Sequence, residues 1–326
     1  MSEARRSRAI GMLILATPCW ALSFPIMKAL ALEQHRLLPD AGSWFFTSLG
    51  VMIRFGVAAL LLLPVLFCLR QNISRRELEQ GVALAFFGGA GILFQMDGLA
   101  YTAASTSAFL TQGYTVFIPL WVMLTTRRRP SLKIILCIAL VLAGLAKLAD
   151  LHLNSLKLGR GELETIVASL MFTGQILLLE QPRYAASRPL QFSLAMFLAM
   201  ALFSLPLVWA TAPSLAACAQ AYASPAACGF MAVLVIVCTL AGYLIMNRWQ
   251  KQVTATEAGL IYCIEPVCVS ALALFLPAWL STWAGINYPD ELLTTRLLVG
   301  GVFVTAANLL LQSPWLEGKS LKTSNG

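Results

Sequence analysis

Long apolar stretches separated by short polar ones dominate the chain. An apolar run of about 18 residues or more can cross a bilayer as a helix, because each helical residue adds about 1.5 Å. Ten such stretches are present: Ala9–Leu32, Trp44–Leu69, Gly81–Tyr101, Ala103–Leu124, Ile134–Leu151, Glu162–Glu180, Leu190–Thr211, Phe230–Asn247, Ala258–Leu280 and Leu292–Trp315. The pattern predicts an all-α polytopic membrane protein with ten transmembrane helices. Eight or nine remain open, since the third and fourth stretches nearly touch and the sixth begins with two glutamates.

Basic residues follow a second pattern, because they are concentrated in alternate loops. If the N-terminus is cytoplasmic, the cytoplasmic segments hold 16 of the 23 Lys and Arg residues and the opposite loops hold 5. Cytoplasmic loops of membrane proteins retain positive charge. The bias therefore predicts an even number of spans with both termini in the cytoplasm.

Composition agrees with this class and limits the partners. Of the 326 residues, 59% are apolar and only 12% are charged, and the net charge is +8. The basic residues are scattered over short loops and form no stripe alternating with aromatic residues, so we expect no nucleic acid partner. They are interpreted as insertion signals that also meet anionic lipid of the bilayer.

Two segments 150 positions apart are similar, and they indicate an internal duplication. Thr106–Tyr114 reads TSAFLTQGY, and Thr256–Ile264 reads TEAGLIYCI. The offset predicts a repeat unit of five helices, with a first repeat over residues 1–151, a second over 152–318 and a cytoplasmic tail over 319–326. Five is an odd number, so the second unit must cross the membrane in the opposite direction. Inverted repeats are typical of secondary transporters, whose site lies near the midplane between the halves.

Glu265 and Pro266 are the most informative residues inside a predicted span. Glu265 lies roughly 12 Å into the ninth stretch at 1.5 Å per residue. A charge there costs at least about 2.5 kcal/mol, so burial favours the neutral carboxyl that a proton-coupled carrier uses. The alternative is a structural hydrogen bond to a neighbouring helix. Pro266 removes a helical hydrogen bond, which either kinks the helix or exposes backbone to a cavity, and Pro119 is expected to act in the same way.

Three further charged residues fall inside predicted spans. Arg54 lies at a depth comparable with that of Glu265, and it either has a structural partner or anchors an anionic substrate. Lys28 and Asp97 lie in the outer third of their spans, where they can form an ion pair or extend toward the headgroups. All three are candidates for buried charge partners.

The remaining polar or amphipathic side chains at span depth are candidates for a substrate cavity. Amides, phenols and indoles in lipid require hydrogen-bond partners, which are either neighbouring helices or a solute in a wet cavity. Together with Pro266, these candidates are Trp20, Gln95, Gln112, Tyr114, Gln175 and Tyr262.

Cysteine and histidine patterns give no catalytic or metal site. Six of the eight cysteines lie in or beside apolar stretches, and the other two, Cys218 and Cys228, bracket an uncharged outer loop whose spacing allows a disulfide without requiring it. His35 and His152 fall in outer loops, with no pattern typical of metal ligands or of a nucleophile and its base. We expect no metal, no cofactor and no enzyme activity, although an intramembrane enzyme using Asp97 and Glu265 remains an alternative.

Several motifs together resemble the drug/metabolite transporter superfamily, EamA type. They are Phe94–Thr102, Ser107–Thr111 and Pro119-Leu120 in the first half, Ala258–Tyr262 and Glu265-Pro266 in the second, and Trp20–Phe24, Lys28 and Arg54-Phe55 near the start. The resemblance implies ten helices in two five-helix repeats, a cytoplasmic (inner) membrane location, and export or exchange of small metabolites without ATP. The chain departs from the family at Arg127–Arg129, at Asp97 and in a long loop over Ser281–Asp290.

These observations predict a secondary-active transporter that works by alternating access. The expected substrate is a small organic metabolite, amino-acid-like or drug-like, with Glu265 as the candidate for coupling to protons, in a monomer or a homodimer. A lipid or amphiphile flippase with the same fold is the main alternative, and it would require a side opening between helices. A channel is not expected, because the sequence contains no repeated filter motif.

Overall fold

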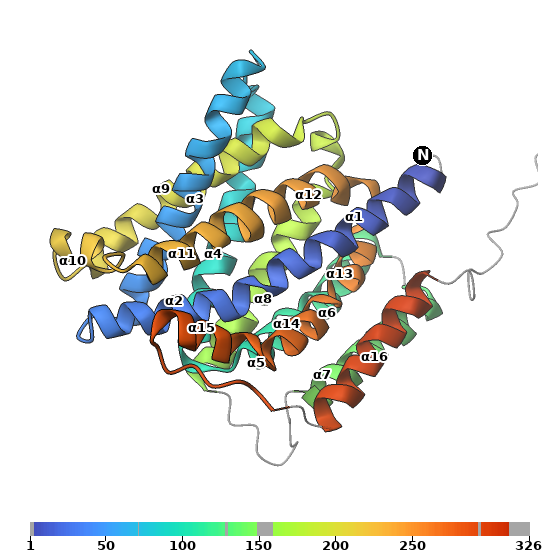
Figure 1. Cartoon of the computed structure of the whole chain (residues 1–326). Helices are drawn as coiled ribbons and strands as arrows, with labels where there is room; N and C mark the ends of the chain where they lie inside the picture. Colours follow the sequence, from blue (N-terminus) through green and yellow to red (C-terminus); the bar gives the residue numbers. More distant parts are fainter. Residues whose placement is uncertain (1–2, 71, 128–129, 149–158, 293–294, 313–326) are drawn as a thin grey trace, which may run out of the picture.

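The computed structural model describes residues 3–70, 72–127, 130–148, 159–292 and 295–312, and these residues are almost entirely helical (Figure 1). The α-helices are α1 (Glu3–Ala21), α2 (Ser23–Leu37), α3 (Ser43–Cys68), α4 (Arg75–Tyr101), α5 (Ala104–Thr111), α6 (Tyr114–Thr126), α7 (Leu132–Leu148), α8 (Arg160–Leu179), α9 (Pro189–Thr211), α10 (Leu215–Gln220), α11 (Pro225–Val233), α12 (Gly242–Trp249), α13 (Ala255–Tyr262), α14 (Glu265–Ala273), α15 (Leu276–Ala284) and α16 (Thr295–Gln312). Three short segments complete the set: η1 (Pro182–Tyr184), the π-helical η2 (Leu234–Ala241) and η3 (Gln250–Gln252).

The predicted fold class is confirmed, since the described residues contain helices and no strand. Eight helical segments within them are long and apolar enough to cross a membrane: Ala4–Leu37, Ser43–Cys68, Arg75–Tyr101, Ala104–Thr126, Arg160–Leu179, Pro189–Thr211, Pro225–Gln252 and Ala255–Ala273. The fifth and tenth predicted stretches correspond to α7 and α16, which do not meet the same criterion over their described residues. The count of ten therefore stays a prediction. The predicted repeat boundary after residue 151 and the tail over 319–326 lie outside the described residues.

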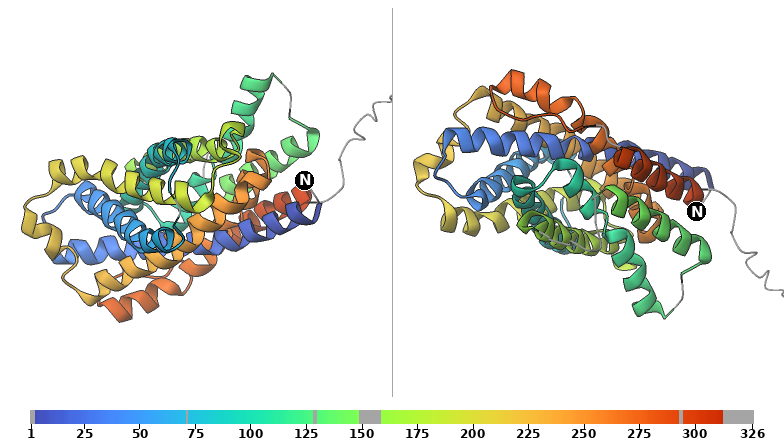
Figure 2. Two further views of the ribbon diagram at one scale, coloured as in Figure 1. Left: turned by 90° about the horizontal axis from the view of Figure 1, so that it is seen from above. Right: turned by 90° about the horizontal axis from the view of Figure 1, so that it is seen from below.

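Helices from the two halves of the chain lie side by side in pairs. Extensive contacts join α3 to α9, α7 to α16, and α4 to both α8 and α9. Smaller contacts join α1 to α12, α5 to α14, and α6 to α13. Figure 2 shows from two further sides that α7 and α16 lie at one edge of the bundle, while α1, α4, α8 and α12 surround its middle. Each half therefore contributes helices to both walls of the bundle centre.

Several membrane-length segments are broken or distorted near their middle. The repeated sequence segments both contain such a break: α5 ends at Thr111 and α6 begins at Tyr114, while α13 ends at Tyr262 and α14 begins at Glu265. Pro266 follows the second break directly and cannot donate a helical hydrogen bond to the carbonyl one turn earlier. Pro119 does not mark the first break, because it lies inside α6 and the break falls at Gln112–Gly113 instead.

The outer surface of the bundle is apolar. Large side chains such as Phe67 on α3 and Trp209 on α9 are more than four-fifths exposed. In water such a surface would favour association, whereas lipid solvates it at no cost. The polar side chains are instead gathered inside, among them Arg54, Asp97 and Gln112.

The two cysteines of the outer loop form no disulfide in the structure, in which both are free thiols. Cys218 lies in α10, where its sulfur approaches the carbonyl of Ser214, and the Cys228 sulfur in α11 lies 3.3 Å from the carbonyl of Tyr222. In place of the disulfide that the spacing allows, each thiol contacts a nearby backbone carbonyl.

Helices α4 and α8 approach each other closely where two glycines meet. A Cβ atom on Gly98 would lie 2.8 Å from the carbonyl oxygen of Gly161, and a Cβ on Gly161 would lie 2.6 Å from that of Gly98. Real Cβ atoms do not come this close to backbone oxygen, so both positions require glycine at this helix separation. Small residues at a helix crossing allow the backbone contact that stabilises helices in lipid.

We predict that Gly98→Ala destabilises the protein by about 1–3 kcal/mol, because α4 and α8 must separate to admit the methyl group. Unfolding of the purified protein in detergent measures this change. Gly11→Ala is the matched control, since a Cβ on Gly11 meets no atom within 4 Å and alanine is the better helix former. Equal melting temperatures for Gly98→Ala and the wild type would contradict the proposed close contact.

Candidate functional site

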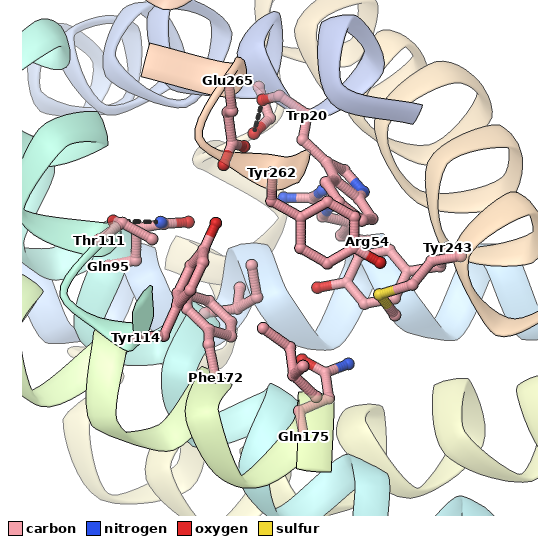
Figure 3. Close-up of a pocket in the computed structure, with 14 residues that line it drawn as sticks. Trp20, Arg54, Gln95, Thr111, Tyr114, Phe172, Gln175, Tyr243, Tyr262 and Glu265 are labelled. Carbon is pink, nitrogen blue, oxygen red and sulfur yellow. Dashed lines mark hydrogen bonds between the residues drawn. The ribbon is translucent and has the colours of Figure 1, made fainter. Parts of the chain in front are cut away.

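A cavity of about 60 Å³ lies in the middle of the bundle, between helices of both halves (Figure 3). At about 10–15 Å³ for each water, it has room for only a few water molecules. The residues that line it come from ten helices: Trp20, Ser23, Arg54, Ile92, Gln95, Thr111, Tyr114, Phe172, Gln175, Ile176, Tyr243, Met246, Tyr262 and Glu265. It thus contains one cation and one acidic residue within a largely aromatic wall.

Glu265 lies at the first position of α14, directly after the break in the ninth span, and its side chain is buried. Its carboxylate accepts a hydrogen bond from the amide of Gln112, with 3.3 Å between Nε2 and Oε2. Gln112 itself lies at the break between α5 and α6. Among the described residues, no Lys, Arg or His forms an ion pair with Glu265. The side chain is therefore held by a neutral donor alone, and Tyr114 and Tyr262 are close enough to interact with it electrostatically.

Arg54 is the buried cation of the cavity, with 1% of the residue exposed. Its Nε donates to the hydroxyl of Thr239 at 2.6 Å, and one terminal nitrogen contacts the sulfur of Met27 at 3.5 Å. Thr239 belongs to the π-helical segment η2, and such distortions are common at functional sites. Within the described parts of the chain, no carboxylate lies within ion-pair distance of Arg54. Its charge is thus held by neutral groups, and guanidinium donors remain for an anion.

Aromatic side chains form the wall between these two charged groups. The ring of Trp20 lies edge-on to Tyr262 and to Tyr243, with centroid distances of 5.1 and 6.0 Å. Tyr262 donates its hydroxyl proton to Gln250 at 2.8 Å, which fixes the ring orientation. Figure 3 shows the Tyr262 and Tyr243 rings beside Trp20, with Tyr114 on the other side of the space below Glu265. The three rings Trp20, Tyr243 and Tyr262 therefore pack directly against one another and form one wall of the cavity.

Polar groups of the lining provide further binding atoms. Gln95 donates to Thr111 at 3.0 Å, which joins α4 to α5. The indole nitrogen of Trp20 and the amide nitrogen of Gln175 are buried and have no hydrogen-bond partner in the protein. An unsatisfied buried donor costs about 1–3 kcal/mol, so these two groups favour an oxygen-bearing guest in the cavity.

Most of the residues selected from the sequence meet in this one cavity. Trp20, Gln95, Tyr114, Gln175, Tyr262 and Glu265 all line it. Gln112 and Pro266 do not line the cavity. Gln112 donates a hydrogen bond to Glu265, and Pro266 is the second residue of α14. Arg54 lines the cavity as well, whereas Lys28 and Asp97 lie elsewhere.

Sequence reasoning missed other lining residues. Tyr243 carried the same signal as Tyr262, a tyrosine inside an apolar stretch, and could have been found by it. The apolar residues Ile92, Phe172 and Met246 carry no such signal, because they resemble every other core residue of a membrane helix.

Asp97 and Lys28 belong to a second polar cluster, near the end of the bundle where α4 ends and α8 begins. Asp97 is fully buried, and its Oδ2 lies 2.5 Å from a terminal nitrogen of Arg160. Arg160 also pairs with Glu164 at 2.8 Å, and its guanidinium group lies over the Tyr101 ring in a cation–π contact. The ammonium of Lys28 instead donates to the backbone carbonyl of Thr102. Asp97 therefore pairs with Arg160 in place of Lys28, because Arg160 at the start of α8 reaches the buried carboxylate directly.

The fold and the cavity define a class before any comparison is made: a multi-pass helical membrane protein with a polar cavity at its centre. Within the described residues, no group of three or more His, Cys, Asp or Glu side chains is arranged to hold a metal ion.

A family model matches the first part of the chain. Residues 7–149 match the model of the EamA-like transporter family, which belongs to the drug/metabolite transporter superfamily. This match confirms the family that the sequence resembles, and the members of that family are membrane transporters. The chain also resembles a solved crystal structure with a TM-score of 0.60 at 15% identity, over 95% of this chain and 98% of that chain, a likeness that concerns the fold alone. No curated protein matches the chain.

The second cluster gives a testable prediction about stability. Arg160→Ala leaves the carboxylates of Asp97 and Glu164 without their cation, so we expect the free energy of unfolding to fall by about 3 kcal/mol. Adding Asp97→Asn to that variant removes one buried charge and should restore part of the loss. Chemical denaturation in detergent measures the three variants as a double-mutant cycle, with Arg75→Ala as a surface control. Additive effects of Arg160→Ala and Asp97→Asn would contradict the pairing.

Proposed function

We propose that the protein is a secondary-active transporter that moves a small organic solute by alternating access around the central cavity. The observation that carries this proposal is the presence of Arg54 and Glu265 in one buried cavity, each without a charged partner among the described residues. Unpaired charges at span depth are costly and mark substrate or ion pathways in membrane proteins. A solute and a coupling ion would supply the missing partners.

The packing of the helices supports two inverted repeats. A two-fold axis in the membrane plane exchanges each helix of the first half with its equivalent in the second. This exchange maps three contacts onto themselves: α3–α9, α7–α16 and α5/α6–α13/α14. It maps the α1–α12 contact onto the α4–α8 contact. All of these contacts are present. The family match over residues 7–149 also ends close to the predicted end of the first repeat.

The lining of the cavity favours a solute with an anionic end and an apolar body. Arg54 retains donors for a carboxylate, which a guanidinium binds with two parallel hydrogen bonds. Trp20, Tyr243 and Tyr262 offer ring surfaces beside it. Glu265 on the same cavity can hold a proton or face an ammonium group. An amino-acid-like metabolite satisfies all three features.

Glu265 is the proposed coupling residue. Within the described residues its side chain accepts a hydrogen bond from the neutral amide of Gln112, a contact that the protonated and the ionised carboxyl can both make. A carboxyl held in this way can gain and lose a proton without breaking an ion pair. Glu265 begins α14, and α13 ends just before it at Tyr262. Because the helix is interrupted there, the backbone at Glu265 can also shift during the cycle.

Polar contacts join the helices at both ends of the bundle, on either side of the cavity. At the face where α1 begins, Arg6 pairs with Glu257 and so joins α1 to α13. At the other end lie the Arg160 cluster and the bond from Lys28 to Thr102. Because a cavity of about 60 Å³ has room for only a few water molecules, the helices must separate before a metabolite enters, and one of these sets of contacts is proposed to break in that step.

A lipid flippase is the rival function, and the lining argues against it. Twelve of the fourteen lining residues are buried, and only Trp20 and Phe172 are partly exposed. The lining is thus buried among the helices, with little surface facing lipid. This burial supports a small solute in place of an acyl chain.

The substrate class can be tested by thermal unfolding of the purified protein with panels of amino acids and other metabolites. We expect stabilisation by solutes that carry a carboxylate, and none by the corresponding amides, because the amide cannot pair with Arg54. Stabilisation by neutral amides as strong as that by the acids would remove Arg54 as the anchor.

We predict that Glu265→Gln abolishes proton-coupled flux of a solute found in this way while leaving folding intact. Glutamine is close in size to glutamate and keeps a hydrogen bond with Gln112, but it cannot release a proton. Flux and internal pH of proteoliposomes give the measurement, and Glu79→Gln, an exposed carboxylate on α4, is the matched control. Unchanged proton-coupled flux in Glu265→Gln would remove this residue from the mechanism.

A further inference from the structure

A second cavity lies at the face of the bundle where α1 begins, far along the helices from the central cavity. It measures about 660 Å³ and is lined by Ala4, Arg5, Arg8, Pro189, Arg248, Trp249, Lys251 and Gln252. These residues come from the first turns of α1, the start of α9, and the end of α12 with η3. Figure 1 shows the N-terminal end of α1 beside the end of α12. The cavity therefore joins the first half of the chain to the second.

Four cations line this cavity, and no acidic residue does. The acidic residues in its neighbourhood are engaged elsewhere: Glu257 pairs with Arg6, and Glu77 pairs with Arg188. Within the described parts of the chain, none of the four lining cations forms an ion pair. Lys251 is also close enough to Arg5 and Arg248 to be repelled by both. Positive charge is thus concentrated here that no group of the described residues neutralises.

The cations keep hydrogen-bond donors available. Lys251 donates to the carbonyls of Ser187 at 2.9 Å and Ala185 at 3.4 Å, which positions it and leaves one of its three donors. Arg8 and Arg248 both lie over the ring of Trp249, with 5.8 and 5.7 Å from the guanidinium carbon to the ring centroid. Both guanidinium groups thus lie against the same ring, and neither is engaged in an ion pair within the described residues. Such an arrangement matches a group with several acceptor oxygens and more than one negative charge.

We propose that this cavity, which we call the basic cavity, binds a phosphate group and thereby links α1 to α12. Two sources of that group fit the chemistry, an anionic phospholipid headgroup and a free phosphate-bearing solute. The cavity lies at the ends of membrane-length helices beside a tryptophan, where headgroups meet the protein. Basic pockets between transmembrane helices bind anionic lipid headgroups in this position.

The test uses the full-length protein in an uncharged detergent and follows its melting temperature. The probes are phosphatidylglycerol in mixed micelles, phosphatidylcholine as a zwitterionic control, and inorganic phosphate at constant ionic strength. We expect stabilisation by phosphatidylglycerol and none by phosphatidylcholine. Saturable stabilisation by inorganic phosphate assigns the site to a phosphate-bearing solute, and stabilisation by the lipid alone assigns it to a headgroup. Stabilisation by neither probe overturns the proposal.

Two pairs of charge-removing variants test whether the cavity itself is the site. Arg8→Gln with Arg248→Gln should raise the half-saturating concentration of phosphatidylglycerol about tenfold. Arg75→Gln with Arg76→Gln removes the same charge at the same face but outside the cavity, and should change it less than about twofold. Equal weakening by both pairs would mean that general surface charge attracts the lipid, and the proposal would fail.

A third pair of substitutions controls for the case in which Arg8→Gln with Arg248→Gln misfolds. Arg5→Gln with Arg8→Gln leaves α12 and Lys251 untouched and should weaken binding as strongly as the first pair. Without lipid, the melting temperature of each pair should equal that of the wild type. Binding of wild-type strength in this pair would contradict the basic cavity.

Discussion

The hydrogen bond between Gln112 and Glu265 is the contact around which the bundle is organised. Each residue lies at a break in a membrane-length segment, and the two breaks occupy equivalent places in the repeated sequence segments, one residue apart in register. A helix break in a membrane exposes backbone groups that lipid cannot satisfy, so it is tolerated only where protein or a wet cavity surrounds it. Placing the two breaks against each other meets that condition for both, and the central cavity forms beside them.

The two halves share this scaffold but differ in chemistry. The first break carries a neutral glutamine and a glycine, and the second carries an acid followed by a proline. The cation of the cavity, Arg54, comes from the first half, while the Thr239 hydroxyl that holds it comes from the π-helical segment of the second. Each charged group is thus supported by a neutral group from the opposite half. Because neither charge is neutralised by an ion pair within the described residues, the cavity keeps two sites at which a solute or a proton can bind.

Much of this architecture could be predicted from the sequence, because the hydrophobic periods and the repeat are strong signals. The helical class and the position of Glu265 in a central cavity with Trp20 and Tyr262 follow from apolar runs and from polar residues that lipid would not accept. The pairing of Asp97 with Arg160 could not be found, since Arg160 belongs to a different repeat and lies in a loop by sequence pattern. The break at Gln112–Gly113 was also hidden, because proline is the usual signal and the nearby Pro119 lies inside a regular helix.

The two cavities are connected through the helices that they share. α1 contributes Arg5 and Arg8 to the basic cavity and Trp20 to the central one, while α12 contributes Arg248 and Trp249 to the first and Tyr243 and Met246 to the second. The Arg6–Glu257 pair holds the same end of α1 against α13. A motion that separates α1 from α12 at this face would therefore also separate groups that line the basic cavity. An anion bound there would stabilise the closed arrangement only, and it would bias the equilibrium by its difference in affinity between the two states.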